Sequence, residues 1–129
     1  MRGHLQKKSK CYRKRFQRWQ LKLFNINEEQ WEIVVVPQSS EHLRRSDRGY
    51  TIGVCDDRTK CIYLADGLSL VLLKKVLCHE IVHAAMFSYN VELTIEQEEL
   101  VADLIATYGL EIVENTNQLF KKIKGAYVE

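Results

Sequence analysis

The sequence contains little that would divide the chain, export it or embed it in a membrane. It has one proline in 129 residues, no internal repeat and no linker rich in proline, glycine or serine. No apolar run approaches the roughly 18 residues of a membrane span, and no apolar signal-peptide core follows the basic N-terminus. We therefore expect one domain spanning residues 1–129, located in the cytoplasm and making no membrane contact.

The four cysteines lack the pattern of a metal ribbon or of a disulfide scaffold. They include no CxxC pair, and they are few for a small secreted domain held by disulfides. Reduced thiols are therefore expected. Cys78 adjoins a histidine, but consecutive helical residues point about 100° apart, so we interpret this thiol as a core residue.

Acidic residues are absent from residues 1–24, which carry nine lysines and arginines, whereas the remainder carries ten against seventeen acids. Tyr12, Phe16, Trp19 and Leu23 lie at spacings of four, three and four, which predicts an amphipathic helix. This basic N-terminal helix either packs on the body or binds a nucleic acid or an acidic partner. The sequence leaves both possibilities open.

Strands are predicted in the next part of the chain. Residues 31–37 are rich in β-branched side chains and end in a proline, which indicates a buried strand. Residues 39–50 predict a polar surface loop. Residues 51–66 predict a hairpin whose two strands flank the turn at residues 56–59.

Helices are predicted in the second half. Residues 70–89 contain no glycine or proline and are apolar over most of their circumference, which indicates a helix buried at the centre of the domain. Thr94 and Gln97 form a capping-box pattern that opens a second helix, and Gly109 is expected to end it. A further helix is expected in the tail, with these residues facing the body: Ile112, Val113, Leu119, Phe120 and Ile123.

The first of these helices contains the motif HEIVH. His79 and His83 are four residues apart, so on a helix they lie on the same face, close enough to bind one ion together. In HExxH sites the two imidazoles bind zinc, and the glutamate, here Glu80, takes a proton from the zinc-bound water. The alternative is a core helix whose polar side chains would cost several kcal/mol in desolvation unless something satisfied them.

A zinc site of this kind needs a third protein ligand. The other histidines, His4 and His42, lie upstream, and no histidine follows the motif, which makes a carboxylate the natural ligand. If the two helices run antiparallel about residues 90–93, Glu99 is level with His83, because each lies a similar rise from the turn.

The same helix arithmetic places Asp103 level with His79, where it would contact the free ring nitrogen of that histidine. Glu98 points about 100° away from Glu99 and is expected to be solvated. It remains the first alternative for the third ligand, ahead of Glu96, Asp103 or a cysteine.

The pair of motifs resembles a known group of enzymes. HEIVH followed by ELVAD resembles the HExxH plus ExxxD pattern of gluzincins, and LCHEIVHA with EELVADLIA is most similar to the small ImmA/IrrE-type metallopeptidases. That resemblance covers residues 50–108. It implies an α+β, minimal zincin-like domain: a small antiparallel or mixed sheet packed on an active-site helix and on a second, ligand-bearing helix, beside the basic N-terminal helix.

The resemblance also implies a function. Members of this family are often encoded on phages and other mobile elements, and several cleave or inactivate a repressor. The expected activity is therefore that of a zinc metallopeptidase, a hydrolase acting on an intracellular protein or peptide, with Zn²⁺ on His79, His83 and Glu99. Glu80 would be the general base.

Two features of such an enzyme are less defined. Tyr89, Tyr108 and His42 are candidates for stabilising the transition state, although an ordinary core or surface role is the stronger interpretation of each. Residues 60–66 precede the motif helix as the substrate-binding edge strand does in zincins, so a peptide is expected to add to that strand. The competing hypothesis is a catalytically silent zincin-fold module that sequesters a protein or nucleic-acid partner.

Overall fold

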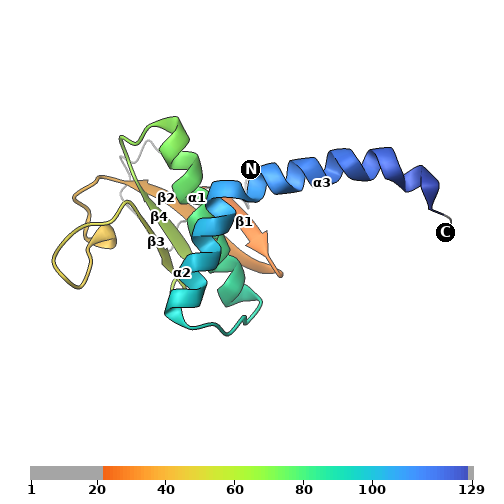
Figure 1. Ribbon diagram of the computed structural model, residues 1–129. Helices are drawn as coiled ribbons and strands as arrows, with labels where there is room; N and C mark the ends of the chain where they lie inside the picture. The colour runs from red at the N-terminus through yellow and green to blue at the C-terminus, as the bar shows by residue number, and fades with distance from the viewer. Residues whose placement is uncertain (1–21, 128–129) are drawn as a thin grey trace, which may run out of the picture.

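The computed structural model describes residues 22–127, which form a mixed sheet and a set of helices (Figure 1). The predicted helical residues Tyr12, Phe16 and Trp19 lie outside the described residues. Along the chain the elements are β1 (Lys22–Ile26), β2 (Glu29–Val36), the 3-10 helix η2 (Glu41–Leu43), β3 (Gly53–Asp56), β4 (Cys61–Ala65), α1 (Leu70–Ser88), α2 (Ile95–Leu104), the π-helical segment η3 (Ile105–Gly109), α3 (Leu110–Ile123) and the 3-10 turn η4 (Lys124–Ala126).

The sheet has four described strands in the order β1-β2-β4-β3. β2 and β4 are parallel, whereas the two outer pairs are antiparallel, so the sheet is mixed, as the α+β prediction allowed. β4 pairs on both sides and all five of its residues are buried. The expectation that residues 60–66 supply an edge strand is therefore wrong, and β3 takes that position.

The hairpin of β1 and β2 was not predicted. Leu23, which we assigned to the end of the amphipathic helix, lies in β1 opposite Glu32. The turn residues Asn27 and Glu28 have φ of 50° and 67°, the left-handed pair that a tight two-residue hairpin requires. The predicted β3–β4 hairpin is confirmed.

Hydrophobic side chains pack on both faces of the sheet. On one face Val34, Leu43 and Tyr63 belong to a cluster that includes the residue from η2, so the polar loop contributes to the core. On the other face Trp31 and Ile62 pack against α1 with its Ala84. Alternation along β2 and β4 divides the side chains between these two clusters, as the two-residue period of a strand requires.

Helix α1 starts at the predicted place, because the Ser69 hydroxyl accepts a hydrogen bond from the backbone of Leu72. Its C-terminal end is tied to the sheet: the Trp31 indole donates to the Ser88 hydroxyl at 2.9 Å. The prediction that the helix is buried throughout is wrong at its first turn, where Leu70 and Val71 are 82% and 84% exposed. Only the part beyond that turn lies between the sheet and α2.

The second helix begins as predicted and does not end as predicted. The backbone of Thr94 donates to the Gln97 side chain at 3.0 Å and the reverse bond measures 3.1 Å, which completes the capping box. Gly109 keeps right-handed helical angles of −62° and −41°, so the chain continues through η3 into α3. A Cβ at Gly109 would lie 2.8 Å from a methyl of Ile105, so the glycine permits close packing here and does not act as a stop.

Helix α3 extends away from the sheet and α1 (Figure 1). The expectation that its apolar residues face the body is wrong, because each of the five is more than half exposed: Ile112, Val113, Leu119, Phe120 and Ile123.

The structure bears on two expectations drawn from the composition, the state of the cysteines and the lack of a membrane span. Cys55 and Cys78 are free thiols, whereas Cys61 is disulfide-bonded, so the expectation of reduced cysteines is wrong for Cys61. Within residues 22–127, the helices lack the combination of length and apolar character that crossing a membrane requires.

Candidate metal centre

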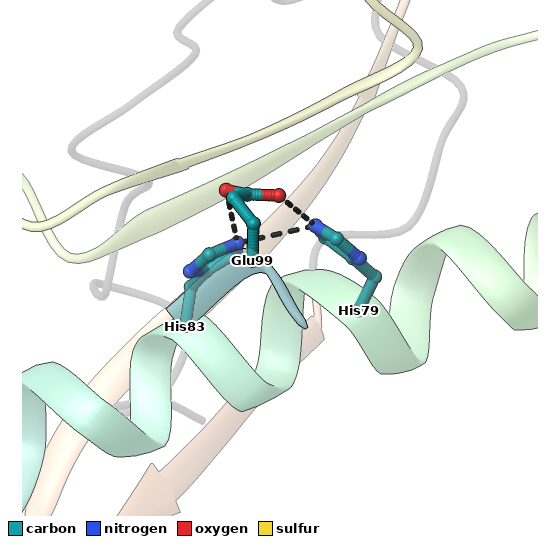
Figure 2. A group of neighbouring side chains, drawn as sticks. All are labelled: His79, His83 and Glu99. Carbon is teal, nitrogen blue, oxygen red and sulfur yellow. Dashed lines mark hydrogen bonds and ion pairs between the residues drawn. The ribbon is translucent and has the colours of Figure 1, made fainter. Parts of the chain in front are cut away.

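His79, His83 and Glu99 converge at one point between α1 and α2 (Figure 2). Their ligand atoms all lie within 4.8 Å of one another. The two Nε2 atoms are 3.1 Å apart, and the Glu99 oxygens lie 3.2 Å from Nε2 of His79 and 3.1 Å from Nε2 of His83. The three residues predicted as ligands are therefore brought together.

The arrangement follows from two antiparallel helices. The four-residue spacing places the two histidines one above the other on α1. Glu99 reaches both of them from α2, and Asp103, one turn later on α2, contacts Nδ1 of His79 at 3.0 Å. The predicted levels, Glu99 with His83 and Asp103 with His79, agree with these contacts.

Each imidazole also has a carboxylate on its second nitrogen. Asp103 lies against Nδ1 of His79, and Glu98 lies 2.5 Å from Nδ1 of His83. An ionised carboxylate only accepts hydrogen bonds, so each Nδ1 carries the donating proton. In a neutral imidazole the other nitrogen, Nε2, then has a bare lone pair, which is the form that binds a metal.

The two Nε2 atoms face the Glu99 carboxylate and each other. Acceptor groups that face one another at 3.1–3.2 Å repel unless a proton or a metal ion lies between them. Ligand atoms placed tetrahedrally about 2.0–2.1 Å from zinc would be about 3.3 Å apart, close to these separations. Two imidazoles and a carboxylate are also a donor set typical of catalytic zinc, so the residues fit that ion.

The position of Glu98 differs from our expectation. We expected it to be solvated, yet its side chain is only 21% exposed, against 52% for Glu99. Adjacent helical carboxylates point about 100° apart, but an imidazole carries nitrogens on two edges of its ring. Glu99 meets one edge of His83 and Glu98 meets the other, so neighbouring positions serve the same histidine.

Glu80 is buried where α1 packs against β3. It is 7% exposed, and a Cβ added at Gly53 would lie 3.1 Å from its Oε2 and 2.6 Å from a methyl of Val76. Burial raises the pKa of Glu80, His79 and His83 oppose that rise, and Glu99 adds to it. The carboxyl group is therefore a better proton acceptor than an ordinary surface glutamate.

The three candidate metal ligands and Glu80 line the same cavity of about 470 Å³. A second cavity of about 250 Å³ shares Thr51, Gly53, His79 and Glu80 with the first, so the two lie side by side along β3. The larger cavity is lined by Thr51, Gly53, Cys55, His79, Glu80, His83, Phe87, Ile95, Glu98 and Glu99. A bound molecule therefore has space next to His79, His83 and Glu99 and beside the edge strand β3.

The candidates for transition-state stabilisation are not among the residues that line either cavity. His42 stacks on Tyr63 with ring centroids 4.1 Å apart, and Tyr63 belongs to the cluster on the face of the sheet away from α1. Tyr89 ends α1 and is 58% exposed, and Tyr108 is 54% exposed in η3.

The roles of two residues of the site differ from the sequence analysis. Glu98 is expected there in solvent or, as the first alternative, on the metal, and not on Nδ1 of His83, while Gly53 is given no role. The signal for Gly53 was present, because an isolated glycine inside a predicted strand often marks a close backbone approach. No comparable signal distinguishes Glu98, since its contact depends on how the imidazole of His83 is turned.

Comparisons with protein-family models, with curated proteins and with solved structures return no match for this chain.

Proposed function

We propose that this chain is a zinc metallopeptidase that hydrolyses a peptide bond in an intracellular protein. The proposal joins the resemblance of HEIVH and ELVAD to small gluzincins of the ImmA/IrrE type with the arrangement of the site. The observation that carries it is the pair of Nε2 atoms 3.1 Å apart, both facing Glu99. Such a set of acceptors calls for a cation, and its donor types favour zinc.

His79, His83 and Glu99 would hold the metal, with Asp103 and Glu98 fixing the two imidazoles through their Nδ1 atoms. Zinc bound there would polarise a water molecule and the carbonyl of the scissile bond. Glu80, which lines the same cavity, would take the proton from that water and then give it to the leaving amine.

The substrate would lie along β3. This strand is at the end of the described sheet and pairs only with β4 there, so its other edge is available for main-chain hydrogen bonds. Thr51, Gly53 and Cys55 line the cavity from this side. An extended peptide added to β3 would place a backbone carbonyl near the ligand group. A transcriptional repressor is the substrate that the family resemblance suggests, in a cytoplasmic, phage-encoded setting.

Metal content is the first test. Mass spectrometry of protein purified without added metal is expected to find about one zinc per chain, with a large loss in Glu99→Ala. Glu96→Ala is the matched control, because it removes an exposed carboxylate from the same helix. A wild-type chain that takes up no zinc even when zinc is offered would refute the proposed metal site.

Catalysis is tested separately with Glu80→Gln. This variant is expected to keep its zinc and to lose about 10²- to 10⁴-fold in the cleavage of a proteome-derived peptide library, because the proton acceptor is removed. If the wild type binds zinc and cleaves nothing, the catalytically silent binding module replaces the peptidase. Partner capture by the zinc-loaded chain would then be the next measurement.

A further inference from the structure

Helix α3 exposes an apolar stripe that no described element covers. The helix is 14 residues long, and its main contacts are with the flanking segments η3 and η4. Its six large apolar side chains are 52–58% exposed: Leu110, Ile112, Val113, Leu119, Phe120 and Ile123. Figure 1 shows the helix standing clear of the sheet and of α1.

The stripe has the spacing of a helix-pairing surface. Val113, Thr116, Phe120 and Ile123 follow one another at intervals of three, four and three residues, and Leu119 flanks them. Thr116 does not interrupt the stripe, because its hydroxyl donates to the carbonyl of Ile112 at 2.7 Å. Covering the stripe would remove these apolar side chains from water and so stabilise the helix.

We infer that α3 pairs in antiparallel orientation with α3 of a second copy of this chain. The distribution of charges along α3 favours a second copy in this orientation. Glu111 and Glu114 lie in its first half, and three lysines follow from Lys121 to Lys124. An antiparallel pair sets each acidic half beside a basic half, twice, and also opposes the two helix dipoles.

Other occupants fit these charges less well. Two copies in parallel would place glutamates beside glutamates and lysines beside lysines. A uniformly basic segment, such as residues 1–24 of this chain, would meet the lysine half of α3, and a uniformly acidic segment would meet the glutamate half.

A symmetric register follows from the stripe. With Gln118 at the centre, Val113 faces Ile123 and Thr116 faces Phe120, because the two members of each pair are equally far from the centre. Leu119 then lies next to its own symmetry mate. The helix spans about 21 Å at about 1.5 Å per residue, so the interface is smaller than a standard one and the dimer is weak.

Sedimentation velocity on the full chain tests the dimer. Its average mass is expected to rise from monomer towards dimer between micromolar and near-millimolar concentrations. Leu119→Glu places a charge at the two-fold axis and should abolish that rise. Gln118→Glu adds the same charge on the opposite face and should leave it unchanged, with circular dichroism checking that both variants keep their helix content.

Cross-linking tests the orientation. Thr116→Cys and Phe120→Cys are expected to form a disulfide-linked dimer when the two variants are mixed, and much less when each is alone. Wild type, with free Cys55 and Cys78, gives the background. The inference is overturned by a wild-type chain that stays monomeric at every concentration, by a dimer that tolerates Leu119→Glu, or by cross-links that form best within each variant.

Discussion

Helices α2 and α3 belong to one continuous helical segment, yet α2 turns polar side chains towards α1 and α3 leaves apolar side chains exposed. In α2 the carboxylates of Glu98, Glu99 and Asp103 face α1 and contact two histidines, while the apolar Leu100 is 70% exposed. In α3 the apolar stripe is exposed, and the main contacts of the helix are with its flanking segments η3 and η4. The difference teaches that α2 is oriented by its polar contacts together with the packing of Val101 and Ala102 on α1, whereas within residues 22–127 no packing of this kind orients α3.

Among substitutions near the candidate metal site, Gly53→Ala should change the stability of the protein most. The added Cβ would lie 2.6 Å from a Val76 methyl and 3.1 Å from Glu80 Oε2, so β3 and α1 must separate. We expect a loss of about 1–3 kcal/mol in the free energy of unfolding, measured by denaturant titration. Gly125→Ala, beyond α3, is the control, because a Cβ there meets nothing within 4 Å. Equal effects of the two substitutions would contradict the close packing of β3 on α1.

The next change concerns zinc affinity. Glu98→Gln removes the charged partner of His83 Nδ1 and should weaken zinc binding about 10- to 100-fold, measured by competition with a chelating dye. Asp103→Asn should have a smaller effect, because the Asp103 side chain is 67% exposed against 21% for Glu98. Glu111→Gln on α3 should leave the affinity unchanged. A Glu98→Gln variant with wild-type affinity would return Glu98 to the solvated role that the sequence suggested.

A matched pair of valines compares the packing of the two regions. Val82 is 9% exposed at the interface of α1 with α2, and Val113 is 58% exposed on α3. Val82→Ala should cost about 1–2 kcal/mol, whereas Val113→Ala should stay within about 0.5 kcal/mol of wild type. Thermal unfolding at low micromolar concentration, where α3 is unpaired, measures both. Similar costs would mean that α3 is packed on the body in solution.

The smallest change has the opposite sign. Burial raises the pKa of Glu80 above its ordinary 4.5, so at neutral pH the folded chain holds a carboxylate whose ionisation is disfavoured. Glu80→Gln should therefore stabilise the metal-free protein by about 1 kcal/mol at pH 7. The gain should shrink as pH falls towards 4.5, because the wild-type carboxyl group then becomes protonated as well. Calorimetry of the two proteins in the presence of a chelator, at pH 7 and near pH 4.5, measures the difference in stability. A variant that is less stable than wild type at pH 7 would contradict the prediction.

Much of the fold could be read from local signals. The capping residues Ser69 and Thr94 start their helices where the sequence predicts, and the β3–β4 hairpin forms about its predicted turn. These features depend on residues within a few positions of one another. The edge strand was predicted wrongly, because the order of strands depends on pairing between β2 and β4, which are distant in sequence.

The sequence by itself determined the spacing of the site. Two histidines four residues apart on a helix, and Glu99 and Asp103 four apart on the next, lie at matching levels when the helices are antiparallel. Only the tertiary structure decided that Glu98 binds the far edge of His83, that Gly109 continues a helix and that α3 is exposed. Spacing is a property of the local backbone, whereas ring orientation, close packing and exposure depend on what lies across the interface.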